Sequence, residues 1–106
     1  KALIMKKERR MKDFSNFSNI KQIYADSTKF DFSTINFTIA FIDGGHDLGT
    51  VCSDTTNCIK NIKKPGVIIW HDYDVTNPVG RYLQSIANKY DIKWVKDTRI
   101  CISYIK

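Results

Sequence analysis

The stretch FTIAFI (residues 37–42), which runs directly into DGGH (43–46), decides the fold of this chain. A second stretch, VIIW (67–70), runs in the same way into HDY (71–73). Both are short, nearly continuous apolar runs rich in β-branched and aromatic residues, which is typical of strands buried on both faces of a parallel sheet. The segment between them has the apolar spacing of an amphipathic helix. The chain therefore predicts a strand–helix–strand unit whose right-handed crossover makes the two strands parallel.

Acids and histidines follow both predicted strands. Because parallel strands end at the same edge of a sheet, we expect Asp43, His46, His71 and Asp72 to converge there. That edge is where open α/β sheets bind their ligands. The sequence pattern thus predicts a candidate site at the carboxyl ends of these two strands.

The rest of the chain supplies further elements of an α/β fold. Residues 1–13 are expected to form the end of a helix, with Leu3, Ile4, Lys7 and Met11 on one stripe. A weakly alternating strand is expected at 20–25. Pro65-Gly66 should stop the first full helix, and a second apolar stripe runs from Val79 to Tyr90. The closing segments 92–95 and 100–105 are expected to form an antiparallel hairpin around the short link 96–99.

Chain length, the length of the apolar runs and the cysteine spacing limit the class of protein. A chain of 106 residues forms at most one domain. No run is long enough to cross a membrane, and no signal peptide is visible. The three cysteines have no metal-type spacing, which indicates reduced thiols and a cytoplasmic location.

The net charge of +6 makes nucleic acid one ligand to consider. A basic face can attract phosphate. The simpler interpretation is solvated helix faces, since no aromatic residues interleave with the basic clusters as single-strand binders require. The basic residues concerned are Lys6, Lys7, Arg9, Arg10, Lys12, Lys60, Lys63 and Lys64.

The two motifs together resemble a known family. FIDGGH (41–46), Asp54 one helix later and PGVIIWHDY (65–73) resemble class I S-adenosylmethionine-dependent methyltransferases, in the branch of macrocin O-methyltransferase-like enzymes. YADS (24–27) and FDF (30–32) are similar to the family's preceding strand and loop. The resemblance implies a Rossmann-like α/β fold: a mostly parallel sheet with a C-terminal antiparallel hairpin. It covers residues 20–105.

One departure from the family matters most. The Gly-rich motif that follows the family's first strand, and the acid after the second strand that holds the ribose, are absent from these residues. We therefore expect residues 1–106 to be the C-terminal part of a methyltransferase domain with its first strands missing. A missing N-terminal half or a partner chain would supply them. Without the Gly-rich turn the backbone cannot approach the cofactor closely, so the chain alone should be inactive.

The resemblance implies a role for the residues at the ends of the strands. Asp26 and Ser27 would lie near the adenine ring of S-adenosylmethionine; the alternative is an Asx turn of Asp26 with Ser27. Asp43, with Gly44 and Gly45 in a tight turn of positive φ, would lie beside the methyl donor; the alternatives are a helix cap for Asp43 and a structural turn for the glycines. His46 would deprotonate an acceptor hydroxyl, or else be a solvated turn residue.

A metal site is the second implication. Asp43, His71 and Asp72 could hold Mg²⁺ or a softer divalent ion, which would lower the pKa of an acceptor hydroxyl. Asp43 would then serve in catalysis with His46 and also as a ligand. Asp54 is expected to be a surface or capping contact.

The sequence leaves three functions open. The first is methyl transfer to an oxygen, or less favourably a nitrogen, of a small molecule, with the protein mainly positioning and deprotonating the acceptor. The second is a non-catalytic half-domain that assembles with a partner chain through exposed strand edges. The third is a basic module that binds nucleic acid.

Overall fold

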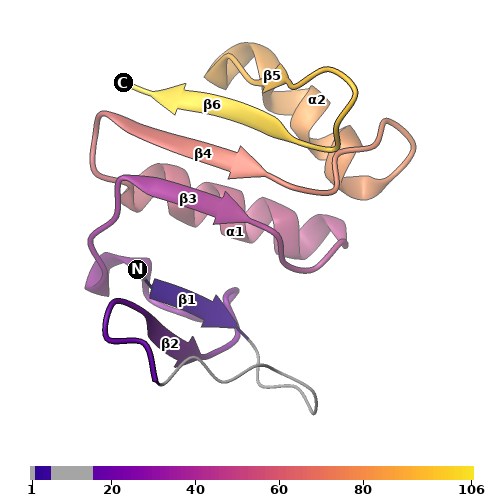
Figure 1. The fold of residues 1–106 in the computed structure, drawn as a ribbon. Helices are drawn as coiled ribbons and strands as arrows, with labels where there is room; N and C mark the ends of the chain where they lie inside the picture. Colours follow the sequence, from indigo (N-terminus) through magenta and orange to yellow (C-terminus); the bar gives the residue numbers. More distant parts are fainter. Residues whose placement is uncertain (1, 6–15) are drawn as a thin grey trace. The chain divides into compact units, whose positions relative to one another are not determined.

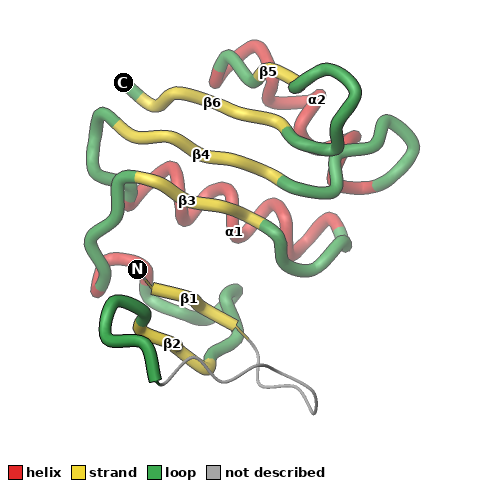
Figure 2. The backbone as a smooth tube through the Cα atoms, viewed as in Figure 1, coloured by secondary structure: helices red, strands yellow, loops and turns green. Residues whose placement is uncertain are grey.

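The structure is a computed structural model that describes residues 2–5 and 16–106 (Figure 1). The chain divides into two compact units, Lys1–Asp31 and Phe32–Lys106. Figure 2 shows the helices, strands and loops of both units along the backbone.

The first unit contains a two-stranded parallel sheet. Strand β1 (Ala2–Met5) pairs with β2 (Lys21–Tyr24), in the register Ala2 with Lys21 and Met5 with Tyr24. The strand expected near 20–25 is therefore confirmed. The helix expected over residues 1–13 is wrong where the structure describes it, because residues 2–5 are a strand. A continuous apolar run fits a buried strand as well as a helix, and periodicity alone does not separate the two. Residues 6–13 of that expected helix lie outside the described part.

The second unit contains the predicted strand–helix–strand. Strand β3 (Ile39–Ile42), helix α1 (Leu48–Asn61) and strand β4 (Gly66–Trp70) follow in order, after a short 3₁₀ turn, η1 (Phe32–Thr34). Strands β3 and β4 are adjacent and parallel, with Ile39 opposite Val67 and Ile42 opposite Trp70. Both features were predicted and are confirmed.

The closing hairpin completes the sheet. Helix α2 (Pro78–Tyr90) leads to β5 (Lys93–Trp94) and β6 (Cys101–Ile105), which pair antiparallel. Strand β6 also pairs antiparallel with β4, so the order across the sheet is β3-β4-β6-β5. The hairpin thus lies on the far side of β4 from β3. An α/β fold with a parallel pair and an antiparallel hairpin is confirmed.

Both helices of this unit lie on the same face of the four-stranded sheet (Figure 1). Alternating residues of the strands point into the core between sheet and helices, and the buried apolar side chains include Ile68, Trp70, Cys101, Val51, Cys58 and Leu83. The intervening residues Ile39 and Phe41 of β3 and Tyr104 of β6 are exposed. Apolar side chains therefore line the sheet on the face opposite the two helices.

Each helix begins at a side-chain cap. The Asp47 carboxylate accepts a hydrogen bond from the backbone N–H of Thr50 (3.0 Å) and caps α1. Asn77 does the same for α2 through the N–H of Gly80 (2.8 Å), with Pro78 in the first turn. Such caps satisfy backbone donors that have no partner inside the helix. Helix α1 ends at Asn61, four residues before Pro65, whose peptide bond with Lys64 is cis.

A buried polar contact ties the first helix to the central strand. The indole N–H of Trp70 donates a hydrogen bond to the hydroxyl of Thr55 (2.9 Å), and both residues are fully buried. A buried donor without a partner would keep its full desolvation cost, so this bond specifies how α1 lies on β4. No helix among the described residues has the length and hydropathy needed to span a bilayer.

Replacing Thr55 by valine should test this contact. Thr55→Val keeps the shape but leaves the Trp70 N–H unsatisfied, and we expect it to lower the free energy of unfolding by about 1–3 kcal/mol. The neighbouring Thr56 is exposed, so Thr56→Val should stay within about 0.5 kcal/mol of the parent. Urea denaturation followed by circular dichroism measures both. Equal effects of the two variants would contradict the role of the bond.

Candidate functional site

The site begins with the register of the parallel pair. Ile42 and Trp70 are partners across β3 and β4, so the next residues, Asp43 and His71, leave the sheet side by side. The backbone N–H of His71 donates a hydrogen bond to the carbonyl of Ile42 (3.0 Å), which extends the pairing one step beyond β4. The predicted convergence of strand-end residues is thus a direct result of strand pairing.

Two histidines contact one carboxylate. Nε2 of His46 lies 2.8 Å from Oδ2 of Asp72, and Nδ1 of His71 lies 3.0 Å from Oδ1 of the same group. Nδ1 of His71 also lies 3.3 Å from Oδ1 of Asp43. Asp72 is the most buried of the four, with 15% of its side chain exposed, whereas 65% of the His46 side chain is exposed. The structure therefore brings all four predicted residues together, with His46 at the rim.

His71 is held in an unusual position between two acids. Its Nδ1 atom is buried, yet no group among the described residues makes a well-aligned hydrogen bond to it, despite the short distances to Asp43 and Asp72. One ligand atom from each of Asp43, His71 and Asp72 lies within 4.8 Å of the others. Two carboxylates and an unsatisfied ring nitrogen form a donor set that suits a divalent cation.

Asp72 combines an unusual backbone with a perturbed carboxyl. Its φ is +65°, in the left-handed region that aspartate and asparagine tolerate better than most residues. Partial burial by itself raises the pKa of Asp72. The neighbouring imidazoles of His71 and then His46 outweigh that effect, and the pKa falls below its ordinary value of 3.8. Asp72 therefore stays ionised, ready to pair with positive charge.

Asn77 links this backbone to the second helix. Its side-chain N–H₂ donates to the carbonyl oxygen of Asp72 (2.9 Å), while its Oδ1 caps α2. The loop folds tightly against the helix, since a Cβ at Gly80 would lie 1.8 Å from the carbonyl oxygen of Asp74. One asparagine thus joins the left-handed residue of the site to a rigid element.

Comparison with known proteins identifies the family. A family described as a methyltransferase domain matches residues 5–73, more than half of the chain, and this region contains the whole acid–histidine cluster. The chain belongs to this methyltransferase family. No curated protein and no solved structure matches it significantly. The resemblance to methyltransferases is thus confirmed at the level of the domain, while the macrocin O-methyltransferase-like branch stays a prediction.

Within the region that matches the methyltransferase family, Asp54 on α1 differs from the prediction in its burial. Asp54 is buried, with 7% exposure, and is not the surface or capping contact that was predicted. A Cβ at Gly44 would lie 3.2 Å from Asp54 Oδ2, so the carboxylate packs close to the glycine backbone. The apolar spacing of α1 gave no sign of this, because a carboxylate on the inner face of a helix breaks the hydrophobic pattern.

Glycine stands at positions 44 and 45 for a different reason from the one predicted. Neither Gly44 nor Gly45 has positive φ, contrary to expectation. A Cβ at Gly45 would lie 3.0 Å from the Thr50 side chain. Close packing against the start of α1, rather than a left-handed turn, therefore favours glycine here. The cap of α1 is Asp47, so the alternative of Asp43 as a cap is wrong.

Asp26 and Ser27 belong to the first unit of the chain. Oδ1 of Asp26 accepts hydrogen bonds from the backbone N–H of Thr28 (3.0 Å) and from its hydroxyl (2.7 Å). This is an Asx-type turn, the alternative to adenine binding, but it is made with Thr28 rather than with the expected Ser27. A role of Asp26 and Ser27 toward the cofactor stays a prediction.

Substitutions of Asn77 separate its two bonds. Serine is as good a helix cap but cannot reach the Asp72 carbonyl, so Asn77→Ser should keep stability within about 0.5 kcal/mol, whereas Asn77→Ala should lose about 1 kcal/mol. Both variants should shift the ring ¹⁵N resonances of His46 and His71, because Asp72 is no longer held. Denaturation and histidine NMR check the two effects. Unchanged histidine signals in Asn77→Ser would show that Asn77 does not position Asp72.

Proposed function

We propose that this segment supplies the acceptor-activating half of a methyltransferase that moves a methyl group from S-adenosylmethionine to an oxygen of a small molecule. S-adenosylmethionine is the methyl donor that membership of a methyltransferase family implies. The observation that carries the proposal is the cluster of Asp43, His46, His71 and Asp72 at one sheet edge. Three unpaired cysteines fit work in a reducing compartment such as the cytoplasm.

His46 is the best placed base. Its Nε2 faces the Asp72 carboxylate at 2.8 Å, so we assign the ring proton to Nε2, which leaves the lone pair on the exposed Nδ1. Asp72 then orients the ring and stabilises the positive charge that forms when Nδ1 takes a proton from an acceptor hydroxyl. Asp43, half exposed at the end of β3, would lie beside the sulfonium of the donor and favour its positive charge. The methyl transfer itself needs alignment of donor and acceptor.

A divalent cation fits the same cluster. Asp43, His71 and Asp72 would hold it, and the imidazole extends the choice from Mg²⁺ to softer ions that accept nitrogen. Such an ion would lower the pKa of an acceptor hydroxyl bound next to it. In that arrangement the unsatisfied Nδ1 of His71 gains the partner that it lacks among the described residues.

A second candidate, assembly with a partner, is favoured by the sheet face opposite the helices. Ile39, Phe41 and Tyr104 are exposed there, and sheets with parallel strands normally have both faces covered. We propose that a further segment or a partner chain covers this face and brings the Gly-rich motif. Binding of the dye ANS, reduced in a Phe41→Ser/Tyr104→Ser variant, would support an open face; no dye binding by the parent chain would contradict it.

The first test concerns the cofactor. These 106 residues lack the Gly-rich turn and the ribose-binding acid, so the chain alone should bind S-adenosylhomocysteine weakly or not at all and show no turnover. Isothermal titration calorimetry measures this directly. Micromolar binding, about −8 kcal/mol, would show that the chain holds the cofactor without those motifs.

The second test concerns the acids, in an enzyme that contains this segment together with the Gly-rich motif. Asp72→Asn should lower the rate of methyl transfer by about 10²-fold or more, because it removes the charge that supports the base. Asp97→Asn is the matched control, since Asp97 also has a left-handed backbone (φ 62°) but lies in the exposed turn of the closing hairpin. Asp54→Asn would not be a neutral control, because that carboxylate is buried.

The same assay separates the metal from the base. Loss of activity in Asp43→Asn and Asp72→Asn together with loss on chelation would support a bound cation. Loss in the variants without any effect of chelators would mean that the acids serve the donor or His46 directly. Retention of methyl transfer in both variants would overturn the site.

A further inference from the structure

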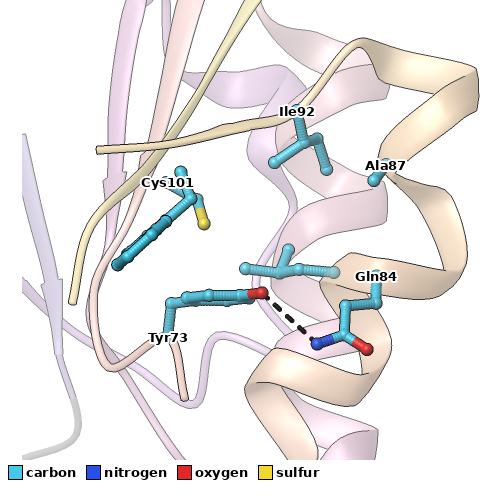
Figure 3. Close-up of a pocket in the computed structure, with 7 residues that line it drawn as sticks. Tyr73, Gln84, Ala87, Ile92 and Cys101 are labelled. Atoms are coloured by element: carbon cyan, nitrogen blue, oxygen red, sulfur yellow. Dashed lines mark hydrogen bonds between the residues drawn. The ribbon is translucent and has the colours of Figure 1, made fainter. Parts of the chain in front are cut away.

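A pocket of about 60 Å³ lies between α2 and the closing hairpin (Figure 3). Figure 3 shows Cys101 facing Ala87 across it, with the ring of Tyr73 and the side chain of Gln84 along one side. Its lining residues are Tyr73, Leu83, Gln84, Ala87, Ile92, Trp94 and Cys101.

The lining is apolar and uncharged. Its polar side-chain groups are few, and the amide of Gln84 donates a hydrogen bond to the hydroxyl oxygen of Tyr73 at 3.3 Å. Burial raises the pKa of the Cys101 thiol to about 11, which keeps it neutral. A charged group would lose hydration here without gaining a partner of opposite charge. The pocket therefore selects a neutral, apolar group.

Two aromatic rings give the pocket a preference for flat groups. The rings of Tyr73 and Trp94 lie 6.5 Å apart at an angle of 41° and form a corner. Trp94 is 51% exposed, yet its indole N–H donates to the carbonyl of Thr98 at 2.7 Å, so its ring is fixed in place. A preformed aromatic surface that costs no ordering on binding favours stacking or edge contacts with another ring.

The pocket and the proposed reaction centre are linked through the chain, because Tyr73 lines the pocket. Tyr73 directly follows Asp72, and its backbone N–H donates to the carbonyl of Arg99 (3.0 Å), which holds this loop against the hairpin. Trp94 and Cys101 are register partners, and Cys101 in turn pairs with Trp70, the last residue of β4 before His71. Neighbouring Cα atoms are about 3.8 Å apart. Tyr73 is thus the residue that links the pocket, which it lines, to Asp72, its neighbour in the chain.

We propose that this pocket is the subsite for a neutral aryl group of the methyl acceptor, an inference that rests on the proposed methyl transfer. A water needs ~15 Å³, so the pocket has room for about four waters. It takes the edge of one ring or a small ring substituent, while the hydroxyl to be methylated points past Tyr73 toward Asp72 and His46. The acceptor is thus a phenol or an aryl-bearing alcohol rather than a phosphate or a carboxylate.

Binding of phenol to the 106-residue chain tests the subsite without any methyl transfer. The chain has two tryptophans, and Trp70 is buried and bonded to Thr55, so their indole N–H signals in NMR distinguish the pocket from the core. Phenol should shift the Trp94 signal with millimolar affinity and leave the Trp70 signal in place. Cyclohexanol, of similar size but without a ring face, should bind several-fold more weakly.

Variants on α2 fix the location. Ala87→Leu fills the pocket and should weaken phenol binding by about tenfold or more, while Asn88→Leu, at the exposed neighbouring position, should change it less than about twofold. Leucine is a good helix former at both positions, so neither substitution opposes helix α2. No shift of Trp94, equal effects of the two variants, or equal binding of cyclohexanol would each overturn the aryl subsite.

Different results would overturn the proposed methyl-transfer site and the proposed aryl subsite. Phenol binding at Trp94 together with full methyl transfer by Asp72→Asn would leave the pocket but remove the proposed site. Loss of transfer in Asp72→Asn, with no phenol binding and no change in KM for aryl acceptors in Ala87→Leu, would keep the site and remove the subsite.

Discussion

The structure depends on the parallel pairing of β3 with β4. This pairing sets Ile42 opposite Trp70 and so fixes Asp43 beside His71. A slip of one residue would turn the side chains of a whole strand to the other face. Trp70 resists such a slip, because its buried indole has one partner, Thr55 on the crossover helix. The geometry of the acid–histidine cluster is therefore a consequence of core packing one residue below it.

The fold of the second unit could largely be predicted from the sequence, because each element has a strong local signal. Two apolar runs and a helical period between them gave β3, α1 and β4, and the short link before Cys101 gave the hairpin. The helix expected at the start failed because residues 2–5 are apolar without interruption, and such a run carries no period. What separates a strand from a helix there is a pairing partner, β2, which lies far along the chain.

The four residues of the candidate site could be predicted from the sequence, but the residues that hold them in place could not. Asp43, His46, His71 and Asp72 follow strand ends, and strand ends can be recognised locally. Asn77 and Asp54 act through backbone and packing contacts that arise only in the folded chain. The one available signal for Asn77 was Asn-Pro before a helical stripe, which is typical of a helix cap. The left-handed backbone of Asp72, which Asn77 holds, had no signal at all in the sequence.

The cysteines of the core have a consequence for how the molecule opens. Burial raises the pKa of Cys58 to about 12 and that of Cys101 to about 11. Alkylating reagents attack thiolates, so both sulfurs should be inert while the protein is closed. Cys58 lies on α1 under the sheet, and Cys101 begins β6 at the wall of the aryl pocket. The alkylation rate of Cys58 would therefore report how often α1 separates from the sheet, and that of Cys101 how often the closing hairpin opens.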